Sequence, residues 1–230
     1  MELRFFDAHE NAAESRRYLR GQERAFAAHR VESVSHEPWM DAGPGAVTLL
    51  GAYDDTGELI GGIRIHCRTV LGRVPIEDYL GDPGMNALLS EWAHASPVEL
   101  GGFWVHPSWT GSGLSDFVFL GSLAASRVRG AKWACGSGHH KVLTFYRKYG
   151  IRFDPSRPYA YPDERYTTYA LYVDLTWAEA PDHPARPYYR DMLAAFRAGH
   201  AYRFTPSTAR TWEPPLADAT PWSRPTLATG

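Results

Sequence analysis

The spacing of apolar and polar residues divides most of the chain into alternating strand and helix patterns. Short apolar, β-branched and aromatic runs bounded by Gly, Pro or Asp are typical of strands, whereas longer stretches with apolar residues three or four apart predict helices. Strands are expected at residues 3–6, 46–53, 59–66, 98–105, 131–135 and 166–175. Helices are expected at residues 11–29, 86–94, 113–129 and 140–149. The pattern predicts an α/β domain.

Two stretches depart from this alternation. Residues 69–96 are rich in turns, and we interpret them as an excursion over the sheet, a position from which connecting segments often contribute substrate contacts. Residues 178–230 are rich in Pro, Ala, Thr and Arg, with one convincing helix at 188–198. Four prolines deny regular structure to the last ~25 residues, namely Pro214, Pro215, Pro221 and Pro225. We therefore expect a domain at residues 1–177 and a C-terminal extension at residues 178–230.

Composition narrows the functional classes only a little. With 44% hydrophobic and 22% charged residues, the chain is typical of a globular protein. A net charge of -2 gives no overall attraction to nucleic acid or to an anionic membrane, so any polyanion site must be local. The N-terminus lacks a basic stretch followed by an apolar one, which favours a cytoplasmic protein without a membrane partner. Cys67 and Cys135 are too few for a disulfide scaffold or a zinc site, so no metal is expected.

A glycine turn joins the strand at residues 98–105 to the following helix. Its sequence is Thr110-Gly111-Ser112-Gly113. In such a turn several backbone N–H groups point at one spot, and the helix dipole adds positive potential there. Glycine also leaves room for an anion to approach the backbone. The turn therefore suits a phosphate or pyrophosphate, although a Gly-x-Gly turn taken alone is also found as a plain tight connection.

The elements around this turn resemble the Gcn5-related N-acetyltransferase (GNAT) superfamily in order and in motifs. A strand, the glycine turn, a long helix, a buried strand and a second helix ending in FYRKYGI (residues 145–151) follow one another. The superfamily carries Arg/Gln-x-x-Gly-x-Gly/Ala at the turn and Leu-Tyr-x-x-x-Gly-Phe on the later helix. The resemblance covers roughly residues 47–175. It implies a mixed, mostly antiparallel central sheet flanked by helices, with its fourth and fifth strands splayed apart.

The chain departs from the superfamily pattern at two positions. Ser108 stands where the family has Arg or Gln, so one side-chain contact to a pyrophosphate is missing while the backbone cradle remains. His139 stands where many members have Asn, seven residues before Tyr146. Polar and basic residues nearby offer compensating contacts, and these are Ser115, Arg127, Lys141, Arg147 and Lys148.

A narrower resemblance links the strand at residues 98–105 to the acyl-homoserine-lactone synthases and the related N-acyl amino acid synthases. The long insertion after the two strands expected at residues 46–53 and 59–66 is similar as well, and it includes residues 74–80 (VPIEDYL). Those enzymes carry Glu-x-Ser-Arg-Phe on this strand and often take acyl groups from acyl carrier protein. Glu99 and Phe103 match, whereas Gly101-Gly102 replaces Ser-Arg. The resemblance implies a carrier-protein donor as an alternative to coenzyme A, and not the lactone-forming reaction.

The resemblance implies an acyl thioester as co-substrate and no permanently bound cofactor. The thioester would be acyl-CoA or a 4′-phosphopantetheine arm, and its carbonyl would meet a backbone N–H of the splayed strand. The residues expected to bind it are Trp104, Val105, Thr110, Gly111, Ser112, Gly113, Leu114 and Ser115. Trp104 and Trp109 are core residues by default and alternatively wall an acyl tunnel.

Four residues are candidates for the proton transfers of acyl transfer. Tyr146 matches the family tyrosine that protonates the leaving thiolate, although a packed helix aromatic is the alternative. Glu99 is a candidate general base because a carboxylate inside a sheet has a raised pKa, although a charge at a sheet edge is an even alternative. His106 and His139 are further candidates since imidazole titrates near neutrality, and each is otherwise a surface or loop histidine.

These residues lead to three functional hypotheses. The first is an N-acyltransferase that acylates an amine of a small-molecule acceptor, with a biosynthetic pathway as its expected setting. The second is a transferase of the same fold that uses aminoacyl-tRNA, which Ser108 and the basic residues on the two helices beside the turn (Arg127, Lys141, Arg147 and Lys148) would suit. The third is a non-catalytic module that binds acyl thioesters. The tyrosine at position 146 and the net charge of -2 favour the first.

Overall fold

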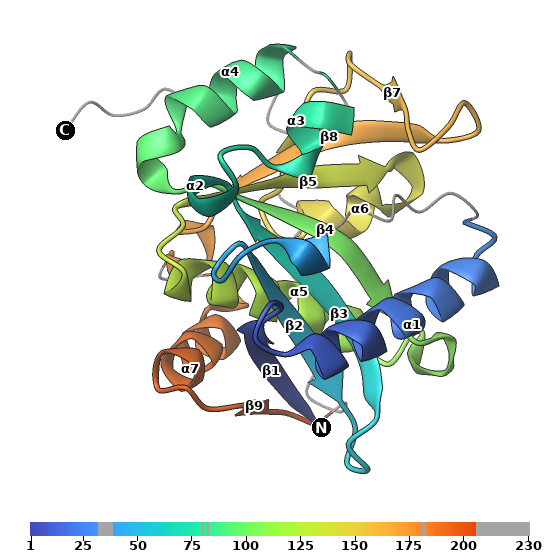
Figure 1. Ribbon diagram of the computed structural model, residues 1–230, viewed down its shortest axis with the longest axis vertical. Coiled ribbons are helices and arrows are strands. Elements are labelled where there is room, and N and C mark those ends of the chain that lie inside the picture. Colours follow the sequence, from blue (N-terminus) through green and yellow to red (C-terminus); the bar gives the residue numbers. More distant parts are fainter. Residues whose placement is uncertain (32–38, 80, 82, 181–182, 206–230) are drawn as a thin grey trace.

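The structure, a computed structural model, describes residues 1–31, 39–79, 81, 83–180 and 183–205. Its strands are β1 Glu2–Asp7, β2 Val47–Tyr53, β3 Leu59–Cys67, β4 Val98–Val105, β5 Trp133–His139, β6 Arg152–Phe153, β7 Tyr159–Ala160, β8 Thr167–Asp174 and β9 Tyr202–Arg203. They form one sheet in the order β6-β8-β5-β4-β3-β2-β1-β9, with β7 also pairing with β8 (Figure 1). β4 and β5 are parallel and the other pairs are antiparallel. The expected mixed, mostly antiparallel sheet is confirmed.

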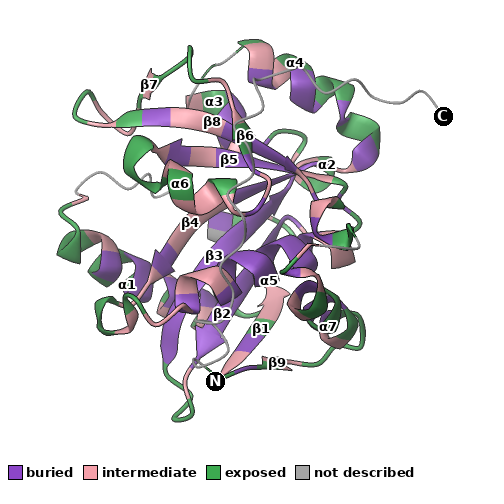
Figure 2. Ribbon diagram, turned by 180° about the vertical axis from the view of Figure 1, so that it is seen from behind, coloured by how far each residue is buried: buried purple, intermediate pink, exposed green. Residues whose placement is uncertain are grey.

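Helices cover both faces of this sheet. They are α1 Ala12–Ala28, α2 Arg68–Leu71, α3 Pro75–Tyr79, α4 Pro83–Glu91, α5 Leu114–Val128, α6 Leu143–Arg147 and α7 Arg186–Arg197. Short 3-10 turns lie at Trp39–Asp41, Ala93–Ala95, Pro107–Trp109, His140–Val142 and Trp177–Glu179. α1 packs on one face of β3 and β4, and α5 packs on the other (Figures 1 and 2). Every residue of β2 and β3 is consequently buried.

The C-terminal segment packs against α5. Tyr189, Met192 and Phe196 of α7 are buried in the same apolar cluster as α5, and β9 pairs with β1. The helix expected at residues 188–198 is confirmed as α7. The Pro-rich tail expected after it lies outside the described residues. None of the helices in the described ranges is long and apolar enough to cross a membrane.

The sheet opens between β4 and β5. Their parallel ladder joins Val98–Leu100 to Ala134–Gly136 and then ends. Between the β4 residues that pair with Gly62 and Arg64, the β3–β4 register shifts, and Gly102 there has a φ of 62°. This bulge turns Phe103 toward α5, where its ring lies 6.0 Å from Phe119. The bulge and the short ladder together leave a space between the two strands, as the GNAT resemblance implied.

The expected elements are present, with two changes of length. β5 was expected to end at residue 135 but continues to His139, through Gly136 and Gly138, where it pairs with β8 over its whole length. The helix expected at residues 140–149 is divided into a 3-10 turn, His140–Val142, and the five-residue α6. As a result, residues at the end of β5 and on α6 lie beside the opening between β4 and β5.

Candidate functional site

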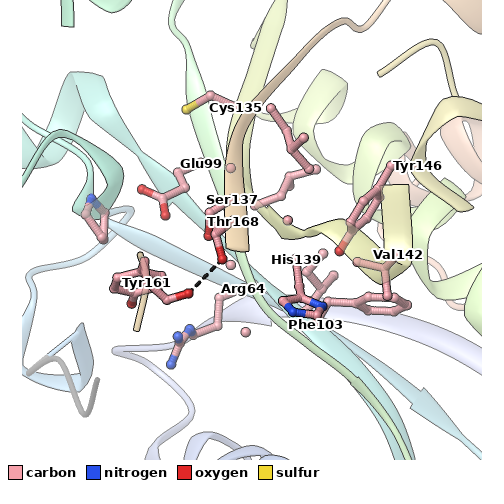
Figure 3. A pocket seen from close by; sticks show the side chains of 18 of the residues that line it. Arg64, Glu99, Phe103, Cys135, Ser137, His139, Val142, Tyr146, Tyr161 and Thr168 are labelled. Atoms are coloured by element: carbon pink, nitrogen blue, oxygen red, sulfur yellow. Dashed lines mark hydrogen bonds between the residues drawn. The ribbon is translucent and has the colours of Figure 1, made fainter. Parts of the chain in front are cut away.

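A cavity of about 610 Å³ lies where β4 and β5 separate. One half is polar and faces α1 and the excursion after β3, with Gln22, Arg64, His66, Tyr79, Glu99, Ser137, Tyr161 and Thr168 in its wall. The other half is apolar and faces α5 and α6, with Phe103, Phe119, Val142, Tyr146, Leu171 and Val173 in its wall. Figure 3 shows Glu99 and Arg64 on the left and Tyr146, Phe103 and Val142 on the right. The cavity therefore connects the two faces of the sheet.

Glu99 is held in the polar half by the excursion that follows β3. Its side chain is only 2% exposed. Its Oε2 accepts a hydrogen bond from the Ile76 backbone N–H at 2.7 Å, and its Oε1 accepts one from the Tyr79 hydroxyl at 2.9 Å. The Tyr79 hydroxyl also lies 3.1 Å from Ser137 Oγ, and its ring stacks on Tyr161 at 4.1 Å. α3 thus fixes one carboxylate in the cavity wall.

Tyr79 stays protonated beside this carboxylate. Burial raises the pKa of Tyr79 well above its ordinary value, and the nearby charge of Glu99 raises it further. A neutral phenol donates a hydrogen bond to a carboxylate, which stabilises the charged form of the acid. The pair therefore keeps Glu99 oriented without placing a second charge in the cavity.

Tyr146 forms part of the opposite wall. It lies on α6, and its ring is 5.1 Å from that of Phe119. Burial raises the pKa of Tyr146 to about 12, so the hydroxyl carries its proton at neutral pH. A protonated phenol in an apolar wall can donate that proton to a developing thiolate.

The glycine turn leaves open space at the N-terminus of α5. Gly111 and Gly113 have φ values of 75° and 83°, and a Cβ added at Gly111 would meet no atom within 4 Å. The Ser112 hydroxyl donates to Trp109 O at 2.6 Å and accepts from the Leu114 N–H at 3.2 Å. Since α5 has fifteen residues, the turn combines the open space at Gly111 with a full helix dipole, while the N–H groups of Ser112 and Leu114 have partners within the turn.

The other residues expected around the thioester occupy different surroundings. Trp104 is buried under α1, with its ring 5.9 Å from Tyr18, and does not line the cavity. Val105 packs against the cluster that contains the buried Leu114. Thr110 ends the 3-10 turn before the glycines, and Ser115 lies in the first turn of α5.

The charges near the turn differ from those that the sequence suggested. Arg127 lies thirteen residues along α5 from Leu114, about 20 Å away, and pairs with Glu179 at 3.5 Å. It cannot contact an anion at the turn, so the expectation of a compensating contact from Arg127 is wrong. Lys148 remains near the turn, with its Nζ 3.8 Å from Asp116 of the first helical turn.

The two candidate histidines lie in different places. His106 is in the loop after β4, where its Nδ1 lies 2.6 Å from Ser108 Oγ, and it does not line the cavity. His139 ends β5 and lines the cavity. Burial lowers the pKa of His139, and the charges of His140 and Lys141 lower it further. Geometry therefore favours His139 over His106 as a group near bound ligands.

Sequence reasoning missed several polar residues of the cavity, which are Gln22, Arg64, His66 and Tyr79. Arg64 and His66 alternate with Ile63 and Ile65, a pattern typical of a strand with one solvent face. Both are nevertheless buried, with exposures of 7% and 2%. Burial lowers the pKa of His66 to about 3, and the charge of Arg64 contributes. The sequence signal that could have revealed them is a long, mostly apolar strand that carries Arg64 and His66 at alternate positions.

The splayed parallel pair, the glycine turn before a long helix and the cavity between the splayed strands define a fold of the GNAT acyltransferase class. Solved structures bear this out. The chain is similar to FeeM, an N-acyl amino acid synthase from uncultured soil microbes, with a TM-score of 0.58 and 17% identity over 75% of this chain and 95% of that one. It is similar to BjaI, a CoA-dependent acyl-homoserine lactone synthase, with a TM-score of 0.56 and 13% identity over 92% and 99%.

An acyl-CoA N-acyltransferase from Pseudomonas aeruginosa has the same fold, with a TM-score of 0.52 and 16% identity over 74% of this chain and 98% of that one. Among curated proteins, the chain is 26% identical to an uncharacterised protein of Mycobacterium tuberculosis over 164 residues, 68% of its own length. A protein of Mycobacterium bovis matches equally well. The chain spans 62% of the length of these relatives. No protein-family model matches it.

Proposed function

We propose that this protein is an N-acyltransferase that moves an acyl group from acyl-CoA or an acyl carrier protein to an amine of a small acceptor. The main support for the proposal is that one and the same cavity contains both groups that the reaction needs. A buried carboxylate, Glu99, lies on one side of the sheet, and a protonated phenol, Tyr146, lies on the other. Acyl transfer from a thioester to an amine needs a base for the amine and an acid for the thiolate.

The reaction follows from this arrangement. The donor pyrophosphate binds the backbone of the glycine turn, and the pantetheine arm follows the unpaired edge of β4. The acceptor amine loses its proton to Glu99 and attacks the thioester carbonyl. A backbone N–H of β4 beside the cavity stabilises the oxyanion. The C–S bond then breaks, and Tyr146 gives its proton to the departing thiolate. The apolar half of the cavity holds the acyl chain.

The comparisons support the donor class. BjaI was solved with SAM and isopentyl-CoA, and FeeM is described as an N-acyl amino acid synthase. Both have the fold of this chain, although the likeness is too distant to carry over a substrate. Ser108 in place of the family's Arg or Gln removes one side-chain contact to the pyrophosphate, which favours a donor that is also held through its carrier protein.

Donor binding tests the proposal. The protein is incubated separately with CoA, acetyl-CoA, octanoyl-CoA, octanoylated acyl carrier protein and bulk tRNA, and binding is measured by calorimetry and melting temperature. A thioester donor present at 100-fold over its Kd adds about 2.7 kcal/mol to the free energy of unfolding. Salt-sensitive binding of tRNA alone would instead favour an aminoacyl-tRNA-dependent transferase. Binding of a thioester without any turnover would leave a non-catalytic module.

A further inference from the structure

Two buried donors in the polar half of the cavity have no hydrogen-bond partner among the described residues, and the Arg64 guanidinium lies over the Trp39 ring at 5.2 Å. The Arg64 and Gln22 side chains are 7% and 1% exposed. Arg64 Nε and Gln22 Nε2 are both buried and form no hydrogen bond with any described residue. A buried guanidinium cannot lose its proton, and a buried unpaired charge is costly. A ligand that accepts hydrogen bonds from these two groups would offset the cost of burying them.

The Gln22 amide and the Arg64 guanidinium both lie against Gly102 at the bulge of β4. A Cβ added at Gly102 would lie 2.7 Å from Gln22 Nε2 and 2.9 Å from Arg64 Nη2. The bulge is held there because the Tyr18 hydroxyl donates a hydrogen bond to the Gly102 carbonyl. Glycine is favoured at this position by its positive φ and by these close approaches, because a side chain here would displace both groups. Figure 3 shows the Arg64 side chain extending along the polar side of the cavity.

The chemistry of the pair matches a carboxylate. A guanidinium presents its N–H groups as a planar fork that suits a carboxylate, and the Gln22 amide adds one neutral donor. His66, next to Arg64 on the same face of β3, stays neutral because burial lowers its pKa to about 3. One positive charge therefore faces the ligand, which fits a monoanion better than a phosphate dianion.

The negative charge of Glu99 lies near the positive charge of Arg64. Arg64 pairs with Gly101 across the β3–β4 ladder, and His66 pairs with Glu99. The two charged residues thus belong to rungs two residues apart, about 7 Å along the strands. A small zwitterion can place its amine toward Glu99 and its acid group toward Arg64.

We infer that Arg64 and Gln22 form a carboxylate subsite for the acceptor, which is therefore an amino acid or a similar amine that carries an acid group. This inference rests on the proposed N-acyltransferase function and specifies its acceptor. Arg64 acts as a specificity residue, and Gly102 keeps the subsite open.

The test compares amino acids with their amides. A mixture of amino acids and the matching mixture of amino acid amides are supplied with the donor that binds best, and N-acyl products are measured by mass spectrometry. Wild-type protein is expected to acylate the acids about 10- to 100-fold more efficiently than the amides. In Arg64→Gln this preference falls to near 1, whereas Arg20→Gln, an exposed arginine on α1, keeps it.

Two further measurements separate a binding role from a structural one. Arg64→Gln removes a buried charge that lacks a hydrogen bond at Nε but also its contact with the Trp39 ring, so its melting temperature is expected to stay close to that of wild type. Gln22→Glu places a like charge beside the carboxylate and is expected to lower acylation of acids while sparing amides. Equal acylation of acids and amides by wild-type protein would overturn the subsite and leave the proposed function standing.

A failure of the proposed function gives a different result. If no donor is turned over, the melting temperature without donor still decides the subsite. The amino acid mixture should raise the melting temperature of wild-type protein more than the amide mixture, and Arg64→Gln should abolish the difference. Equal shifts in both proteins would contradict the subsite.

Discussion

At the scale of single residues, Glu99 combines deep burial with two hydrogen bonds that fix its orientation. The Ile76 N–H and the Tyr79 hydroxyl hold one oxygen each. Both partners belong to the excursion after β3, so a segment that appears in the sequence as a turn-rich connection positions the proposed base.

Glu99→Gln tests this role because glutamine keeps the shape of the side chain but cannot take a proton from the amine. We expect kcat to fall about 10²- to 10⁴-fold, with little change in the Kd of the thioester donor. Initial rates and calorimetry measure the two quantities. Glu23→Gln, an exposed position on α1, serves as the matched control. Unchanged turnover in Glu99→Gln would assign the base to another group.

His66 makes stability depend on pH. The folded protein holds its pKa at about 3, whereas an unfolded histidine titrates near 6.5. Between these values only the unfolded chain binds the proton, so the free energy of unfolding falls as pH decreases from 6.5, by up to about 1.4 kcal/mol per pH unit. His66→Asn should lose about 2 kcal/mol less than wild type between pH 8 and pH 5. Urea unfolding at both pH values measures this, and equal losses would contradict a buried neutral His66.

At the scale of elements, the glycine turn and α5 form one unit for binding anions. The structure offers an internal comparison, because Gly130 ends the same helix with a φ of 85° and, like Gly111, has open space around its missing Cβ.

Gly111→Ala and Gly130→Ala should therefore strain the backbone equally, at about 1 kcal/mol or more in the free energy of unfolding. Only Gly111→Ala adds a methyl group where the donor approaches, so only this variant should raise the Kd for a thioester donor. Urea unfolding and calorimetry check the two effects. Equal donor affinity in both variants would place the donor elsewhere.

The order of these elements was predictable from sequence because each depends on local signals. The turn at residues 110–113 has its glycines, α5 has a long apolar pattern, and β8 is rich in Tyr, Thr and Val. The polar half of the cavity was not predictable in the same way. Tyr79 lies on a five-residue helix too short to show a period, and Arg64 resembles a residue on a solvent face until α1 covers it.

Long-range packing also explains the extent of β5. Gly136 and Gly138 weaken any strand prediction for residues 136–139. In the fold Gly136 is required because a Cβ there would lie 2.7 Å from the Leu100 backbone oxygen, and a Cβ at Gly138 would crowd Leu171 at 2.6 Å and the Tyr146 ring at 3.0 Å. The sequence contains the glycines, but only the neighbouring strand and helix give the reason for them.

At the scale of the whole molecule, the core extends beyond the segment that resembles the GNAT superfamily. α7 contacts α5 extensively, and the rings of Phe5 and Phe196 meet at 5.1 Å. The helix that opens at the glycine turn therefore rests on the C-terminal segment.

Phe196→Ala should destabilise the protein by about 3–5 kcal/mol because it leaves a cavity between α7 and β1. Arg190→Ala, exposed on the same helix, should stay within about 0.5 kcal/mol of wild type. Urea unfolding followed by two probes measures both variants. A loss of less than about 1 kcal/mol in Phe196→Ala would mean that α7 unfolds separately from the core.

Multiple-turnover amide formation is the most direct test of N-acyl transfer by this protein. Wild-type protein and Tyr146→Phe are supplied with acyl-CoA donors of two to twelve carbons, or the matching acyl carrier proteins, together with a mixture of small amines. Wild-type protein is expected to form N-acyl products in excess of enzyme, and Tyr146→Phe to form them about 10²- to 10⁴-fold more slowly, with donor affinity retained. Donor binding with no amide product, or turnover that is unchanged in Tyr146→Phe, would contradict this expectation.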